Sequence, residues 1–470
     1  MIPRKNILVR SAEAVTTLDL FRVPGYTFCQ YDDSMSKASL FGSGHPLRRG
    51  FPLSCQQVQD VAMMPLIKLS IVFAGIVLLL SRRWNLGFVL LLACAAVGLV
   101  FGYPLRAVGR DVVLTSVDLF TLQLALSILL IMLLSELLRE TASLQGMVRA
   151  LQALIPSGRL VIAALPALVG LLPMVGGAMF SAPMVNEVGD RFNVDRERKT
   201  FINYWFRHIW EYVFPLYPSM MLAAALLSLE TFQLASATWP LTAAAVVSGG
   251  LFGLIGMPRT PNSAIESSAR LAGLRTLLIS IWPIGLVILL SLALPLDSRF
   301  TLILALVVTI ALVMLINGMS LQTLGHILHK RIPWKTIAVL FGALIFRRVL
   351  ENSGAVHGVS EALVQSHVPL VAIAFLVPFV AGLLTGLSHA AFSIGFPVVV
   401  PLVASDGAAI TSGWAAWMMA GAFLGVMCSP LHLCLSLTRL YFEADWGPIY
   451  RRIAPSSLVV AATAAVLLLS

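Results

Sequence analysis

Long apolar runs separated by short polar stretches fill the chain from Met63 to the C-terminus. Runs of about 20 apolar residues are long enough to cross a bilayer as helices. The pattern therefore predicts an all-α polytopic membrane protein. Its ten expected spans lie at residues 65–81, 86–104, 118–138, 201–229, 238–257, 274–295, 299–316, 335–350, 411–441 and 453–470.

Two glycine-containing stretches interrupt this pattern, GLLPMVGGAMFS at residues 170–181 and GLLTGLSHAAFS at residues 382–393. They are identical at six of twelve positions, at an offset of 212 residues. Adding 212 to the start of each early span gives a number close to the start of a late span. The sequence thus predicts two repeats of five spans, at residues 63–258 and 259–470.

An odd number of spans in each repeat makes the second repeat cross the membrane in the opposite sense, as in many secondary transporters. Most Lys and Arg residues of the loops fall on one face of this topology. Loops on the other face carry chiefly Arg106, Arg110 and Arg299. Because cytoplasmic loops are rich in Lys and Arg, this asymmetry sets the expected orientation. We expect a multi-pass protein of the cell inner (cytoplasmic) membrane, in contact with the lipid bilayer.

Residues 160–188 and 368–403 are too long for one span and too short for two. Each range contains Gly near its centre and Pro nearby, and these residues break helices. Broken backbone at membrane depth is tolerated only inside protein or beside water. We therefore predict a re-entrant hairpin in each range. The fourth span of each repeat is also expected to be broken, at Pro215 and Pro218 and at Pro430.

Inverted repeats would bring the two hairpin tips and the two breaks together near the middle of the membrane. Helix N-termini there expose free N–H groups and partial positive charge, which suit an anion. Alternatively, the glycines and serines let helices pack closely, or the hydroxyls bond carbonyls freed by the prolines. The candidate residues for substrate binding or ion coupling are Gly176, Gly177, Ser181, Glu211, Tyr217, Ser219, Thr385, Ser388, His389, Ser393, Ser429 and His432.

Two of these candidates are titratable residues suited to carry a coupling proton. His389, at the second tip, has an unperturbed pKa of about 6.5 and exchanges a proton at physiological pH. Glu211 follows Arg207 and His208 on one helical face. Acids and histidines within membranes often form proton relays. The alternatives are a neutral histidine bonded to a carbonyl and an internally neutralised cluster around Glu211.

Composition agrees with the membrane assignment and excludes other classes. The chain has 470 residues, of which 58% are hydrophobic and only 11% are charged, and its mean hydropathy is +0.90. A soluble protein of this size cannot cover its surface with so few charges. The net charge of +10 comes without a basic run interleaved with aromatics, so we expect no nucleic-acid partner. We expect no metal and no cofactor, because no metal-ligand spacing is found among the cysteines Cys29, Cys55, Cys94, Cys428 and Cys434.

Residues 1–62 are polar and aperiodic, and they lack the features of a signal peptide. Two interpretations stay open for this N-terminal extension. It is either a disordered tail, or the product of a start codon placed too far upstream of Met63 or Met64. The second interpretation is favoured because the repeat begins near residue 63.

The stretches ALVGLLPMVGGAMFSAPMVNEV and INYWFRHIWEYVFPLYP resemble an uncharacterised family of prokaryotic integral membrane proteins grouped with the ion transporter superfamily. The usual motif has Pro where Val175 stands. The resemblance covers about residues 63–470. It implies an inverted repeat with two hairpins, a possible homodimer, and secondary transport of a small, often anionic solute, as in carriers for citrate, dicarboxylates, gluconate and arsenite. Ser-Asn-Thr motifs hold ion and substrate in the sodium-coupled relatives, and neither tip here contains one.

The expected function is secondary active transport of a small, anionic solute, with H⁺ favoured over Na⁺ as the coupling ion. The first alternative is an ion channel, because the same hairpins can line a pore. The second is an intramembrane enzyme. Neither HExxH nor GxSxG occurs, and no Walker-type motif is present. We therefore expect no enzyme and no catalytic residues.

Overall fold

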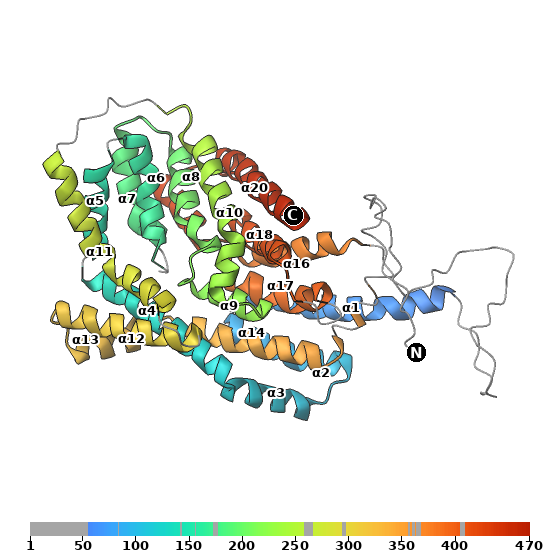
Figure 1. Cartoon of the computed structure of the whole chain (residues 1–470). Coiled ribbons are helices and arrows are strands. Elements are labelled where there is room, and N and C mark those ends of the chain that lie inside the picture. The colour runs from blue at the N-terminus through green and yellow to red at the C-terminus, as the bar shows by residue number, and fades with distance from the viewer. Residues whose placement is uncertain are drawn as a thin grey trace, which may run out of the picture. The chain divides into compact units, whose positions relative to one another are not determined.

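The protein is all-helical over the part that the structure covers. The computed structural model (Figure 1) describes residues 55–82, 84–141, 143–155, 157–172, 177–257, 267–293, 298–355, 358–359, 362, 368–404 and 409–470. Within these ranges every regular element is a helix and no strand occurs. The predicted all-α class is confirmed.

The helices of the first half are mostly short, and two of them depart from α-geometry. These two are the 3₁₀-helix η2 (Ile209–Tyr212) and the π-helix η3 (Gly250–Leu254). The α-helices are α1 (Cys55–Ser81), α2 (Leu86–Phe101), α3 (Leu105–Val117), α4 (Leu119–Glu140), α5 (Ser143–Leu154), α6 (Gly158–Gly170), α7 (Gly177–Asp190), α8 (Arg196–Arg207), α9 (Pro218–Leu227) and α10 (Thr231–Gly249).

The second half repeats the alternation of long and short helices. Its described helices are α11 (Ser267–Ala293), α12 (Ser298–Ile316), α13 (Leu321–Lys330), α14 (Trp334–Asn352), α16 (Leu370–Thr385), α17 (Ser388–Val403), α18 (Ser412–Cys428), α19 (Leu433–Phe442) and α20 (Trp446–Leu469).

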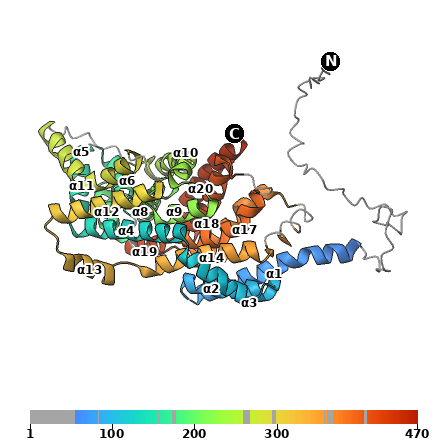
Figure 2. The same ribbon diagram turned by 60° about the horizontal axis from the view of Figure 1, so that its bottom comes forward.

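Two large apolar cores hold these helices together. One core contains residues of α1, α2, α4, α9, α12, α14, α16 and α17. The other contains residues of α6, α7, α8, α10, α18, α19 and α20. In both ribbon views, α14 lies beside α2 and α3 (Figures 1 and 2). Both cores contain helices from the two halves of the chain, so the halves fold as one unit.

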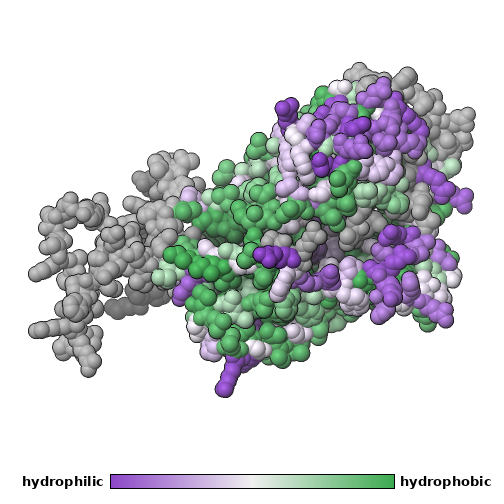
Figure 3. Space-filling model, turned by 180° about the vertical axis from the view of Figure 1, so that it is seen from behind, coloured by the Kyte–Doolittle hydropathy of each residue, from purple (hydrophilic) through white to green (hydrophobic). Residues whose placement is uncertain are grey.

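Several helices are long and apolar enough to cross a membrane. Among the described residues these are Leu119–Glu140, Thr231–Leu254, Leu271–Ser291 and Trp446–Leu469, together with the segment Ser412–Phe442, which contains both α18 and α19. The surface agrees, because hydrophobic residues form a broad continuous area of the face in Figure 3. Leu99, Leu315 and Leu458 are each about 70% exposed or more (70%, 75% and 69%). Such exposure suits lipid, and these apolar helices are compatible with the predicted polytopic membrane protein.

The remaining predicted spans are shorter or interrupted. Those at 65–81, 86–104 and 299–316 correspond to helices whose apolar parts, Met64–Leu80, Leu86–Phe101 and Phe300–Ile316, are at most 17 residues long. The span predicted at 335–350 lies within α14, whose C-terminal end carries Arg347 and Arg348. The span predicted at 201–229 is divided among α8, η2 and α9.

Each predicted hairpin range contains two helices packed against each other. The range 160–188 holds α6 and α7, and the range 368–403 holds α16 and α17. Gly386 ends α16 with a φ of +65°, and α17 begins two residues later. The arms of the second hairpin pack closely, since a Cβ atom on Gly395 would lie 2.7 Å from the Cα atom of Pro378. That spacing leaves no room for any side chain larger than glycine.

The first break separates α8 from α9, where Pro215 and Pro218 prevent a continuous helix. The carbonyl groups freed here find side-chain donors on α10. Thr242 Oγ1 donates to the Ile209 carbonyl at 2.9 Å, and Thr238 Oγ1 donates to the Tyr212 carbonyl. Ile209 and Tyr212 are buried, and an unpaired buried carbonyl is costly, so these two threonines stabilise the break.

The second break separates α18 from α19 around Pro430, and tyrosines supply the donors there. Tyr204 Oη donates to the Met427 carbonyl at 3.1 Å, and Tyr450 Oη donates to the Cys428 carbonyl at 2.9 Å. Tyr204 belongs to α8 of the first half. The two breaks are therefore linked directly.

The predicted N-terminal extension lies mostly outside the described residues, which begin at Cys55. The helix α1 starts at this residue, within the predicted extension.

Candidate functional site

The tip of the second hairpin contacts the first break through Ser388 and Glu211. Ser388 Oγ donates a hydrogen bond to Glu211 Oε2 at 3.0 Å. The Glu211 side chain is only 10% exposed, and Ser388 is 9% exposed. A buried carboxylate is costly unless its oxygens are hydrogen-bonded. The serine therefore stabilises Glu211 in its charged form at this position.

The same tip lies directly against the second break. A Cβ atom on Gly386 would lie 2.6 Å from the backbone nitrogen of His432. Gly386 also has a φ of +65°, a region that residues with a side chain rarely adopt. Both the conformation and the close approach require glycine, which explains this residue at the tip.

His208 and His432 bring the two breaks into contact. Their ring centroids lie 4.9 Å apart at an interplanar angle of 84°. His208 Nδ1 lies 2.6 Å from the Tyr204 carbonyl, and a carbonyl oxygen only accepts, so this nitrogen carries the proton. In the neutral ring Nε2 is then an acceptor, and it lies 3.8 Å from Glu211 Oε1. We call His208, Glu211, Gly386, Ser388 and His432 the tip–break cluster.

Arg207 places a positive charge at the start of α7. A Cβ atom on Gly177 would lie 2.4 Å from Arg207 Nη2, so the guanidinium covers this glycine. Arg207 is 3% exposed, and its charge acts on Glu211 and His432. The N-terminus of α7 adds free N–H groups and partial positive charge. Arginine and helix N-terminus together form a surface suited to an anion.

Asn203 joins three helices beneath this surface. It lies on α8, is fully buried, and accepts a hydrogen bond from Ser181 Oγ of α7 at 2.6 Å. Its Nδ2 donates to the Ala178 carbonyl at 2.9 Å and to Thr438 Oγ1 of α19 at 3.2 Å. Asn203 thus fixes the first hairpin to both broken helices.

Three of the predicted site residues bond the backbone. Tyr217 Oη donates to the Gly170 carbonyl, and Thr385 Oγ1 donates to the Ala381 carbonyl at 2.7 Å. Ser429 Oγ donates to the Leu383 carbonyl at 2.6 Å. These contacts correspond to the alternative in which hydroxyls satisfy carbonyls near helix breaks.

The other predicted residues are not joined to the cluster by any described bond. Ser219 and Ser393 are buried, at 3% and 0% exposure. His389 Nε2 and Ser393 Oγ are buried and have no hydrogen-bond partner within the described ranges. Gly176 lies outside the described residues. The structure therefore brings together Glu211, Ser388 and His432 from the predicted set, and places Gly177 under Arg207.

Sequence reasoning missed Asn203, Tyr204 and Cys434, and treated Arg207 and His208 only as neighbours of Glu211. The available signal was the concentration of polar residues in INYWFRHIWEY, residues 202–212. Cys434 gave no signal. Of its two histidine neighbours, His208 lies far away in the sequence, and His432 alone, two positions before the cysteine, does not indicate a metal site. His208, His432 and Cys434 each offer a ligand atom within 4.8 Å of the others.

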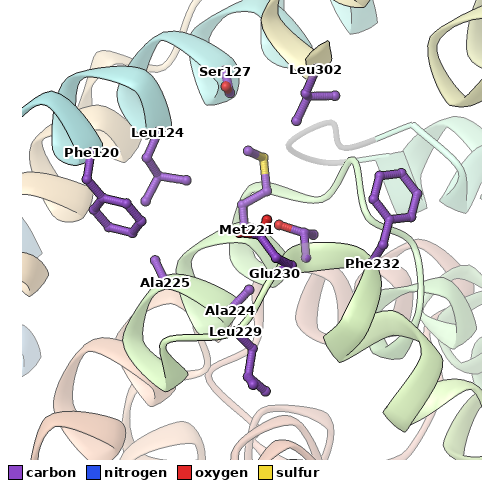
Figure 4. Close-up of a pocket in the computed structure, with 11 residues that line it drawn as sticks. Phe120, Leu124, Ser127, Met221, Ala224, Ala225, Leu229, Glu230, Phe232 and Leu302 are labelled. Carbon is purple, nitrogen blue, oxygen red and sulfur yellow. The ribbon is translucent and has the colours of Figure 1, made fainter. Parts of the chain in front are cut away.

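A small pocket elsewhere shares no residue with the cluster (Figure 4). It has a volume of about 50 Å³, and its lining comes mainly from α4, α9 and α10. Because about 10–15 Å³ of such space is enough for one water molecule, the pocket has room for several waters.

Charged residues gather where α8, α19 and α20 have neighbouring ends. Arg196 Nη1 lies 3.3 Å from Glu443 Oε2, and Arg452 Nη2 lies 3.6 Å from Asp195 Oδ2. The basic loops after the first hairpin and before the last helix therefore lie at one end.

Comparison with known families gives a match over residues 65–470 to a family described as "Protein of unknown function (DUF401)". The chain belongs to this family. The expectation of an uncharacterised family is confirmed, and the match does not tie the chain to the ion transporter superfamily. No curated protein matches the chain.

Proposed function

We propose that the protein is a secondary active transporter of a small, anionic solute, coupled to H⁺ rather than Na⁺. The solute site lies at the tip–break cluster, with Arg207 and the start of α7 as its positive wall. The observation that carries the proposal is the contact of one hairpin tip with both helix breaks. Discontinuous helices that meet in this way form the binding sites of many transporters.

The order of the helices supports the inverted repeat on which the proposal depends. The helix α6 begins at Gly158, and α16 begins at Leu370, 212 residues later. The same offset separates the ends of α4 and α14. Helix boundaries thus follow the offset that the sequence motifs suggested.

The pairing of helices supports a two-fold relation between the halves. The helix α2 packs on α14, while α12 and α4, which stand at the corresponding positions, pack on each other. Likewise α7 packs on α19, and α17 packs on α9. Exchanging the halves leaves these pairs unchanged, as expected for repeats related by a pseudo-two-fold axis.

The charges at the site favour an anion and a proton. Arg207 offers a planar guanidinium that recognises carboxylate or phosphate through two hydrogen bonds. Glu211 Oε1 and His208 Nε2 lie 3.8 Å apart, a distance at which a proton on His208 favours the charged form of Glu211. Acid–histidine pairs of this kind carry protons through membrane proteins.

Uptake into vesicles tests the proposal. Purified protein is reconstituted, and uptake of radiolabelled small carboxylates and inorganic phosphate is measured under an imposed pH gradient, a sodium gradient, or neither. We expect at least one anion to accumulate only with the pH gradient. Electrical recording on the same vesicles identifies a channel, whose currents far exceed the turnover of a carrier. Such currents, or the absence of accumulation for the whole panel, would contradict the proposal.

A further inference from the structure

Three soft or borderline metal-ligating side chains meet beside the tip–break cluster. His208, at the end of α8, and His432 and Cys434, at the start of α19, present ligand atoms within 4.8 Å of one another. All three are buried, at 1%, 8% and 9% exposure. The ligands come from both halves of the chain, so the sequence spacing of the cysteines could not indicate the group.

Both histidines are oriented as metal ligands usually are. A ligating histidine typically donates its second nitrogen to a backbone carbonyl or carboxylate, which fixes the ring. His208 does so through Nδ1, which donates to the Tyr204 carbonyl at 2.6 Å and leaves Nε2 as the ligand. His432 is held by a hydrogen bond to the backbone of Gly386, and its Nδ1 has no hydrogen-bond partner among the described residues. A buried nitrogen without a partner is costly in an apolar interior.

The chemistry of the donors selects the metal. Two imidazoles and one thiolate form a set that binds Zn²⁺ and related d¹⁰ cations. Zn–N bonds of about 2.0–2.1 Å and Zn–S bonds of about 2.3 Å place tetrahedral ligands roughly 3.3–3.8 Å apart. Closing from 4.8 Å to that spacing requires side-chain movement of about 1 Å.

Neighbouring charges affect how favourably a cation binds among His208, His432 and Cys434. Arg207 acts against it, since its charge reaches His432 and Cys434. Glu211 opposes Arg207, because Glu211 Oε1 lies 3.8 Å from His208 Nε2 and brings a negative charge to the group. Binding also releases the Cys434 thiol proton to water, and the resulting thiolate neutralises one charge of the metal.

We propose that His208, His432 and Cys434 form a binding site for a d¹⁰ metal cation such as Zn²⁺, beside the Glu211 carboxylate. A bound ion would join the end of α8 to the start of α19. Metal binding does not depend on the proposed transport, and it is measured without any uptake assay.

Cadmium is the spectroscopic probe, because a cadmium–thiolate bond gives an ultraviolet charge-transfer band. The full chain in detergent is titrated with Cd²⁺ in a reducing buffer free of thiols. We expect a saturable band at one ion per chain. In Cys434→Ser the band is lost, whereas Cys428→Ser, whose Sγ contacts Ser457 Oγ at 3.6 Å, retains it. Absence of the band in the wild type, or its persistence in Cys434→Ser, overturns the proposal.

A stability measurement decides the matter if Cys434→Ser does not fold. Zn²⁺ raises the thermal unfolding midpoint of any protein that it binds only in the folded state. We expect this rise in the wild type and in Cys428→Ser. In His432→Gln the apparent Zn²⁺ affinity falls by roughly 100-fold or more, since loss of an outer-shell partner alone costs roughly 10- to 100-fold. An equal Zn²⁺ response in His432→Gln and the wild type refutes the site.

Discussion

Ser388 Oγ donates a hydrogen bond at 3.0 Å to Glu211 Oε2, across 177 residues of sequence. The serine stands at the start of α17 and the glutamate in η2, so the bond joins the second hairpin to the first break. Both residues stand out in the sequence as polar side chains within apolar runs. Their contact joins two interrupted segments into one site.

Removing this bond should weaken coupling to protons. Ser388→Ala leaves Glu211 without its serine partner, and hydrogen bonds to charged groups contribute about 1.5–3 kcal/mol. We therefore expect uptake driven by a pH gradient to fall roughly tenfold, since about 1.4 kcal/mol corresponds to a factor of ten. Ser436→Ala, which removes an exposed hydroxyl bonded to the Pro430 carbonyl, serves as the control. Equal uptake by the two variants would show that the bond has no role in coupling.

Gly386→Ala tests the approach of the hairpin tip to the second break. The added Cβ would lie 2.6 Å from His432 N, and residues other than glycine also incur about 1–2 kcal/mol of strain at positive φ. Gly102→Ala is a matched control, because Gly102 has a φ of +72° but a Cβ atom added there would meet no atom within 4 Å. We expect a clearly lower thermal midpoint and lost uptake in Gly386→Ala alone. Similar losses in both variants would attribute the effect to backbone strain.

Arg207 should be required for anion recognition. Arg207→Gln removes the positive charge beside Gly177, and we expect uptake to be abolished. Arg207→Lys keeps the charge but loses the planar pair of donors, so intermediate uptake with a raised KM is expected. The control is Arg191→Gln, since the Arg191 side chain is 67% exposed and pairs with Glu187. Wild-type KM in Arg207→Lys would argue against bidentate recognition.

Asn203 should be needed for stability. Asn203→Ala removes three hydrogen bonds that join α7, α8 and α19, and a typical hydrogen bond contributes about 0.5–1.5 kcal/mol. We expect a marked fall in the thermal midpoint of the purified protein. Asn317→Ala removes one local bond, to the Val313 carbonyl, and should change the midpoint little. If the two variants have the same thermal midpoint, Asn203 does not hold the helices in the way described.

The sequence indicated many of the residues and helix breaks of the site, but few of the contacts between them. Gly386 and Pro430 mark a helix end and a helix break through their local backbone chemistry, which acts over a few residues. Glu211 and Ser388 were found because charged and polar groups in apolar runs are costly unless they are used. Such local rules also predicted the helical class.

The missed features depend on contacts between distant segments. In the sequence, Cys434 cannot be distinguished from an ordinary buried thiol. Only the fold places His208 of α8 beside it. Asn203 gives no periodic signal, because its partners lie on α7 and α19. Thr385 and Ser429 illustrate the converse, since a hydroxyl that bonds a carbonyl and a hydroxyl that binds a solute look the same in sequence.

The most direct test of the account is solute-driven proton movement in sealed vesicles that contain a pH-sensitive dye. An anion that the wild type takes up is added outside, with no gradient imposed. We expect the vesicle interior to become more acidic with the wild type and to stay unchanged with Glu211→Gln, which cannot ionise. Entry of the anion without any pH change, or equal acidification by Glu211→Gln, would contradict proton-coupled transport through this site.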